Sequence, residues 1–182
     1  PTGFPSFQQQ KRKLKIRLEN SDILSIICIF QQFVDFMKSA GKRTVKKIIA
    51  LTGVPGTGKT SVARELAKLG WTVVDLNALA RSLGLVLSHD DSDDSDVVDV
   101  KALGKIVQAL VPVLGSEIVF EGHLSCEFKI GGATAVVLRT NPEILKSRLS
   151  KRGYSKSKIS KNTLSEMLDY CVIKSRANYK KV

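Results

Sequence analysis

Short apolar runs alternate with longer stretches of helical periodicity along residues 46–182. The apolar runs predict buried strands at 48–51, 71–74, 117–120 and 134–138. Apolar residues that recur every three or four positions predict helices at 59–69, 76–83, 100–110, 142–150 and 162–174. Strands that alternate with helices of this length are typical of βαβ units. The pattern therefore predicts an α/β fold with a parallel sheet.

Residues 1–45 have a different pattern, which predicts an extension before the α/β domain. A basic arm at 11–17 is followed by the capping residues Asn20, Ser21 and Asp22. The apolar residues after them recur at helical spacing: Ile23, Ile27, Phe30, Val34 and Met37. We therefore expect two parts, a basic arm with an amphipathic helix over 1–45 and the α/β domain over 46–182.

Charge changes the picture of possible partners. The net charge of +12 is concentrated at 1–47 and 141–182, which flank a mildly acidic middle. Such a balance indicates polyanionic partners, or else a solvated lysine-rich surface. No apolar run reaches the roughly 18 to 20 residues of a membrane-spanning helix, so no membrane partner is expected. Three distant cysteines without CxxC spacing favour a reducing compartment and a cytoplasmic protein, or a nuclear one in a eukaryote.

One motif carries the chemistry. Residues 53–60 read GVPGTGKT, a complete GxxxxGK[ST] loop between a predicted strand and a predicted helix. Lys59 is expected to contact the β- and γ-phosphates of ATP, and the Thr60 hydroxyl to bind Mg²⁺. Ser61 is expected beside the α-phosphate. ATP and Mg²⁺ are therefore the predicted cofactors, and the predicted binding residues are Gly56, Gly58, Lys59, Thr60 and Ser61.

A second carboxylate and a basic segment complete the candidate site. Glu121 follows a predicted strand, where a P-loop protein holds Mg²⁺ through water. His123 is expected close to the transferred phosphoryl group. Arg152 lies next to Gly153, which fits a lid arginine that excludes water from a phosphoryl transfer. Arg139 follows another predicted strand and is expected at the same edge of the sheet.

The aspartate-rich segment 90–96 invites a calcium interpretation. It lacks the central glycine and the terminal glutamate of an EF-hand loop, so that interpretation is rejected. A solvated mobile loop that covers the second substrate is expected instead.

Five segments together resemble the atypical adenylate kinases of archaea and eukaryotic nuclei, the CINAP type. They are LTGVPGTGKTS at 51–61, VDLNALAR at 74–81, IVFEGHLSCEF at 118–128, VVLRTNPEILKSRLSKRGY at 136–154 and the KSKISKNTLSEML that follows. The resemblance implies a P-loop NTPase three-layer sandwich and a nucleoside monophosphate kinase that also hydrolyses ATP. It further implies a role in small ribosomal subunit maturation, with ribosomal protein uS11 and pre-ribosomal RNA as partners. It places Arg81 in a monophosphate-binding segment near 74–97, and Arg152 in a lid near 151–161.

The resemblance also marks three departures. Glu121 stands where the eukaryotic members have Asp, and residues 1–36 have no counterpart. The family continues beyond the position of Val182 with another strand and a C-terminal helix, so the chain is expected to lack both. Without them, the sheet would have an uncovered edge.

Three functions stay open from the sequence. The first is a kinase that transfers the γ-phosphoryl group of ATP to AMP or a similar acceptor. The second is an ATPase that acts as an assembly factor on a ribosomal protein or RNA, with little metabolic role as a kinase. The third is a P-loop kinase of another small metabolite.

Overall fold

The structure is a computed structural model that describes residues 46–91 and 94–182. These residues belong to one compact unit, Lys42–Val182. The helix expected over 23–37 lies outside the described residues. Among the described residues, no helix has the length and apolar character needed to cross a membrane.

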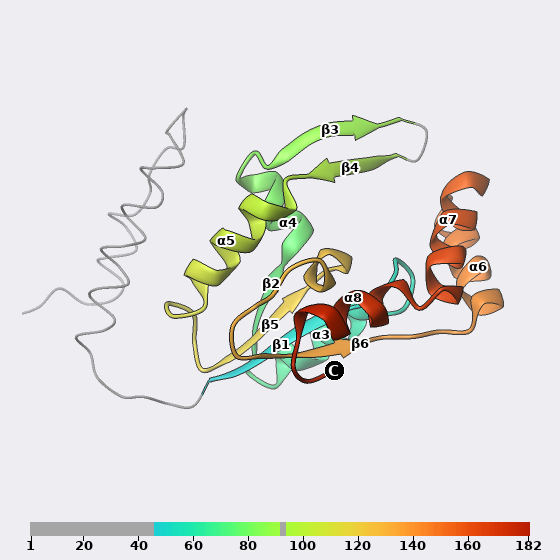
Figure 1. The fold of residues 1–182 in the computed structure, drawn as a ribbon. Coiled ribbons are helices and arrows are strands. Elements are labelled where there is room, and N and C mark those ends of the chain that lie inside the picture. The colour runs from blue at the N-terminus through green and yellow to red at the C-terminus, as the bar shows by residue number, and fades with distance from the viewer. Residues whose placement is uncertain (1–45, 92–93) are drawn as a thin grey trace, which may run out of the picture. The chain divides into compact units, whose positions relative to one another are not determined.

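A four-stranded parallel sheet forms the centre of this unit (Figure 1). Its strands are β1 (Lys47–Thr52), β2 (Thr72–Asp75), β5 (Glu117–Glu121) and β6 (Ala133–Val137), in the spatial order β2-β5-β1-β6. Each expected strand is present within one residue of its expected ends. Glu121 pairs in register with Leu51 of β1 and with Asp75 of β2, so the carboxyl ends of three neighbouring strands are level.

The alternation of side chains along β5 builds two cores. Ile118 and Phe120 are fully buried in one apolar cluster, and Val119 is buried in another. Successive side chains of a strand point to opposite faces, so these clusters lie on the two faces of the sheet. Helix α3 (Lys59–Lys68) contributes Ala63 to the Val119 side, and α5 (Val100–Leu110) contributes Leu103 to the other. The predicted three-layer α/β sandwich is confirmed.

Side-chain caps begin several of the helices. Asp75 caps α4 (Leu76–Ser82) by accepting from the backbone N–H groups of Asn77 and Ala78. Asn141 caps α6 (Pro142–Lys151) and Ser155 caps α7 (Lys156–Met167) in the same way. The short helix η1 (His123–Cys126) follows β5 directly.

The expected helix over 162–174 is wrong, because the structure divides this stretch. Helix α7 ends at Met167, and α8 (Tyr170–Asn178) begins after Asp169. Asp169 adopts a left-handed conformation with φ of 56°, which a continuous helix does not allow. The Arg139 guanidinium lies 2.6 Å from the Asp169 carboxylate and stabilises this corner.

The expected loop over 90–96 is also corrected. Strands β3 (Val86–Asp90) and β4 (Ser95–Val98) form an antiparallel hairpin with His89 opposite Asp96. Polar cross-strand pairs stabilise such a hairpin without an alternating apolar pattern. Figure 1 shows the hairpin extending from the sheet toward the side where α7 lies.

A smaller cluster and the chain after α8 support the segments around the site. Val54, Leu145 and Leu149 are buried together with Cys126 and Cys171, which connects the glycine-rich loop to α6 and α8. The Tyr179 hydroxyl donates to the carbonyl oxygens of Ser125 and Phe128, at 2.6 and 2.8 Å. Lys181 then accepts a hydrogen bond from the Ala135 N–H of the edge strand β6.

The substitution Gly53→Ala tests how closely the loop after β1 packs against its neighbours. Its φ is 136°, and a Cβ there would meet the Leu138 carbonyl oxygen and lie 2.9 Å from Thr57 Oγ1. Gly84→Ala is the matched control, because Gly84 has φ of 65° with open space around the added methyl. Urea unfolding should show a loss of about 1 kcal/mol for Gly84→Ala, and a loss at least about twice as large for Gly53→Ala. Equal losses would contradict this account of the loop.

Candidate functional site

Residues 53–60 form a loop that joins β1 to α3 and closes on itself. Gly56 has φ of 94°, and a Cβ there would lie 2.8 Å from Leu145 Cδ1 of α6. The Thr57 hydroxyl donates to the Val54 carbonyl oxygen at 3.0 Å. The N–H groups of Ser61 and Val62 both donate to the Gly58 carbonyl oxygen, so the helix begins immediately after the glycine. Such a loop at a helix N-terminus is a favourable site for phosphate.

Lys59 folds back over this loop. Its Nζ donates to the carbonyl oxygens of Gly53 and Val54, at 2.8 and 3.1 Å, and its side chain is buried. Burial lowers the pKa of Lys59, while the nearby Glu121 carboxylate opposes the shift. The ammonium therefore lies against the backbone of the loop. To contact the β- and γ-phosphates of ATP, it must exchange its hydrogen bonds with these carbonyl oxygens for bonds with phosphate oxygens.

Three oxygen-bearing side chains meet where β2, β5 and α3 come together. Glu121 is buried at the end of β5, and Thr60 of α3 is close enough to influence its carboxylate. Burial is the first cause that raises the pKa of Glu121, and the charge of Asp75 raises it further. A hydroxyl and carboxylates are the ligands that Mg²⁺ prefers. This donor set fits Mg²⁺, which Thr60 and Glu121 would hold.

Sequence reasoning missed Asp75. It follows the apolar residues Val73 and Val74, just as Glu121 follows Val119 and Phe120. The same strand-end signal could have identified it. Its N-cap bonds to α4 account for one of its carboxylate oxygens.

His123 begins η1, two residues beyond Glu121. Its side chain is exposed to the cavity described below, while protein surrounds the ring on its other sides. This burial, followed by the charge of Lys59, lowers the pKa of His123 to about 4. The imidazole is therefore neutral at pH 7, with one nitrogen able to donate a hydrogen bond and the other able to accept one.

One cavity of about 640 Å³ brings the predicted residues together. The glycine-rich loop and α3 line one part of it, and the strand ends line its floor. Nine of the ten residues that the sequence analysis placed at the site line it: Gly56, Gly58, Lys59, Thr60, Ser61, Arg81, Glu121, His123 and Arg152. Sequence reasoning did not select the hairpin residues His89 and Asp96 or the α7 residues Lys158 and Asn162, which also line it.

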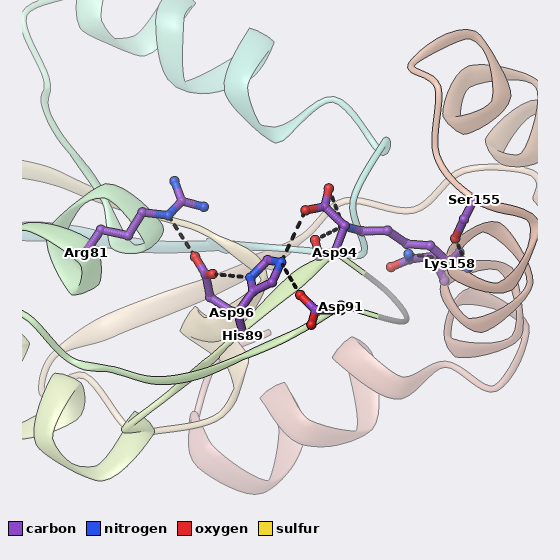
Figure 2. Close-up of polar contacts among 8 residues, drawn as sticks. Arg81, His89, Asp91, Asp94, Asp96, Ser155 and Lys158 are labelled. Carbon is purple, nitrogen blue, oxygen red and sulfur yellow. Dashed lines mark hydrogen bonds and ion pairs between the residues drawn. The ribbon is translucent and has the colours of Figure 1, made fainter.

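A polar contact joins the hairpin to α7 (Figure 2), and both of its residues, Asp94 and Lys158, line the cavity. Lys158 Nζ donates to the Asp94 carbonyl oxygen and lies 3.9 Å from the Asp94 carboxylate. The same ammonium lies 4.7 Å from the centre of the Tyr154 ring. The Ser155 hydroxyl accepts from the Lys158 N–H and fixes the first turn of α7. The hairpin and α7 therefore touch within the lining of the cavity.

Two arginines near the site have other partners. Arg139 donates through Nε to the buried Glu166 carboxylate at 2.6 Å, and it is absent from the cavity lining. Arg148 donates to the Gly56 carbonyl oxygen at 3.2 Å, behind the glycine-rich loop. Arg139 was expected at the cavity edge, but Glu166 and Asp169 bind its guanidinium instead.

Comparisons with known proteins give the family. A family model described as an AAA domain matches residues 49–169. A protein named "Putative adenylate kinase" from Methanocaldococcus jannaschii is 36% identical over 70% of this chain and 71% of its own length. Its namesake from Pyrococcus furiosus is 38% identical over 74% of this chain and 72% of its own length. The chain belongs to this family.

Family membership makes the chain a P-loop phosphotransferase of the nucleotide kinase type. The archaeal part of the resemblance is therefore confirmed, and the eukaryotic nuclear type stays a prediction. Among solved structures, the Pnkp1/Rnl/Hen1 RNA repair complex matches with 21% identity and a TM-score of 0.48, covering 75% of this chain and 48% of that one. A gluconokinase from Sinorhizobium meliloti matches with 20% identity and a TM-score of 0.41, covering 70% and 75%.

Lys59→Met tests the phosphate loop. Methionine keeps the length of the side chain and removes the ammonium, so the fold should persist while phosphoryl transfer falls by at least about a hundredfold. Lys68→Met is the control, because Lys68 is an exposed residue of the same helix. Steady-state ADP formation and circular dichroism provide the measurements. Turnover within about tenfold of the unsubstituted protein, a barrier change below about 1.4 kcal/mol, would contradict the predicted role of Lys59.

Arg139→Ala tests the structural role that its partners indicate. Removing the guanidinium leaves the buried Glu166 carboxylate without its charged donor, which should lower the free energy of unfolding by about 2 kcal/mol. The KM for ATP should change by less than about twofold, because Arg139 does not line the cavity. Arg176→Ala, at an exposed basic residue of α8, is the control. A raised KM for ATP without a loss of stability would show that Arg139 contributes to ATP binding.

Proposed function

We propose that the protein is an adenylate kinase that transfers the γ-phosphoryl group of ATP to AMP. One observation carries the proposal: a single cavity of about 640 Å³ joins the glycine-rich loop to Arg81 and the β3–β4 hairpin. Two anion-binding elements in one cavity suit two phosphate-bearing substrates that react with each other. The monophosphate-binding segment near 74–97 and the lid near 151–161 are the corresponding parts of the chain.

The glycine-rich loop would bind ATP through its backbone N–H groups, at the N-terminus of α3. Lys59 and Arg152 would supply positive charge to the phosphoryl group, where charge develops during transfer. Mg²⁺ held by Thr60 and Glu121 would neutralise phosphate charge. Asp75 lies beside Glu121 and makes this end of the cavity selective for cations.

The hairpin and the lid would exclude water from the transfer. Lys158 of α7 reaches Asp94 of the hairpin, so the two segments meet over the cavity. A reaction between two bound phosphates requires this exclusion, because water competes with AMP as the acceptor. His123 is neutral at pH 7 and would orient the acceptor, or a water molecule, through a hydrogen bond.

ATP hydrolysis and a role in small ribosomal subunit maturation are further proposals, which rest on the resemblance in sequence. Residues 141–182 contain eleven Lys and Arg residues against three Asp and Glu, a balance that suits pre-ribosomal RNA. Ribosomal protein uS11 is the proposed protein partner, and the cytoplasm, or the nucleus of a eukaryote, the proposed location.

An acceptor screen tests the kinase proposal. The protein is incubated with Mg-ATP and either AMP, CMP, GMP, UMP, shikimate or gluconate, and the products are separated by anion-exchange chromatography. ADP formation that depends on AMP and exceeds hydrolysis by at least about tenfold is expected. Transfer only to a sugar or to shikimate would replace the proposal with a kinase of another metabolite. Release of phosphate without transfer to any acceptor would favour the ATPase.

His123→Ala separates hydrolysis from transfer. Water is small and mobile and needs the imidazole to orient it, whereas AMP is positioned by its own binding contacts. ATP hydrolysis should therefore fall more than transfer to AMP, with both rates measured on one preparation at saturating Mg-ATP. Equal losses would mean that His123 acts on the phosphoryl group itself.

A further inference from the structure

The Asp96 carboxylate is held between a cation and an imidazole (Figure 2). Arg81 donates through Nε to Asp96 Oδ2 at 2.9 Å. His89 Nδ1 lies 3.0 Å from Asp96 Oδ1. Arg81 is in the last turn of α4, and the other two residues are on the hairpin, so the three connect separate elements.

The hairpin register sets this arrangement. His89 and Asp96 are directly opposite each other on β3 and β4, which places the two side chains within reach. The hydrogen bond from Arg81 is the first cause that lowers the pKa of Asp96, and the contact with His89 is the second. Asp96 is therefore an anion at neutral pH, and its two oxygens serve two partners.

The atom through which Arg81 binds Asp96 matters. A guanidinium has five N–H donors in a planar fork, and only one of them is on Nε. In Figure 2 the contact between Arg81 and Asp96 runs through Nε alone, and neither terminal amino group of Arg81 contacts a residue drawn there. A pair of parallel hydrogen bonds from such amino groups is the strong mode of phosphate recognition. Arg81, His89 and Asp96 all line the same cavity as the glycine-rich loop.

We propose that Asp96 is a positioning residue for the acceptor phosphate: through Nε it fixes the guanidinium of Arg81 so that both terminal amino groups face a phosphate monoester in the cavity. His89 fixes the carboxylate from its other side. This inference rests on the proposed function, in which Arg81 binds the acceptor. The side chain of Arg81 is largely exposed, so without Asp96 it would sample many rotamers and lose that orientation.

Charge alone predicts the opposite effect. The Asp96 carboxylate is negative and would lie near the negative acceptor phosphate. If Asp96 only neutralised Arg81, removing the carboxylate would strengthen phosphate binding. Orientation predicts weaker binding after removal. The direction of the change in KM for AMP therefore distinguishes a positioning residue from a neutralising one.

The first experiment measures KM and kcat for both substrates in Asp96→Ala. The KM for AMP should rise by about tenfold, while the KM for ATP and kcat stay within about twofold. Asp91→Ala is the matched control, since it removes a carboxylate from the same hairpin that is 98% exposed and absent from the cavity lining. Asp96→Asn keeps an oxygen that accepts from Nε and should restore most of the affinity for AMP.

The second experiment is a double-substitution cycle with Arg81→Ala. If Asp96 acts through Arg81, then Asp96→Ala should not raise the KM for AMP further once Arg81 is absent. Additive effects, a lowered KM or an equal effect in Asp91→Ala would each overturn the inference. If the unsubstituted protein forms no ADP from AMP, the proposed function fails and the inference fails with it. Transfer to AMP with an unchanged KM in Asp96→Ala refutes the inference alone.

Discussion

The level carboxyl ends of three parallel strands are the constraint on which the site depends. Register places Leu51, Asp75 and Glu121 side by side, so the glycine-rich loop, the N-terminus of α4 and the start of η1 all leave the sheet at one edge. In open parallel sheets, ligands bind at this edge. A shift of one residue in β5 would turn Glu121 to the other face and move His123 away from the loop. The relative positions of the side chains at the site therefore depend on the register in which the strands pair.

Burial gives that edge its electrostatic character. Lys59 and Glu121 are both nearly inaccessible, and each favours the charged state of the other against the cost of desolvation. Asp75 adds a second negative charge on the adjacent strand, and it raises the pKa of Glu121. A cation bound among these groups would relieve the repulsion between the carboxylates. The arrangement stores an unfavourable interaction that substrate and metal would relieve together.

The elements that could be predicted from the sequence are those marked by a run of buried apolar residues or by a pattern of glycines. Ile118 to Phe120 are buried on both faces of the sheet and stand out as an apolar run, and the loop at 53–60 carries its own glycine pattern. The hairpin escaped prediction because β3 and β4 are stabilised by polar pairs such as His89 with Asp96, which leave no apolar alternation. The break between α7 and α8 depends on a left-handed aspartate, Asp169, and not on a glycine or proline.

The nine predicted residues that line the cavity follow the same rule. Eight of them lie in or next to the glycine-rich loop, near a strand end or beside a glycine turn, where local sequence determines position. Arg81, in the last turn of α4, was placed by the family resemblance instead. Arg139 was misplaced because its partner Glu166 lies 27 residues further along the chain, on a helix whose start was not foreseen. Long-range ion pairing of this kind has no local signature in the sequence.

The contact between Lys158 and Asp94 joins the hairpin to α7 through polar groups, and both residues line the cavity. The joint between hairpin and α7 is made by an ammonium, a carbonyl oxygen and a carboxylate, so opening it exposes little apolar surface. Breaking a contact of that kind changes the heat capacity little, since heat capacity follows apolar hydration. Water and dissolved ions compete directly for the ammonium. Rising ionic strength should therefore loosen the contact between the hairpin and α7.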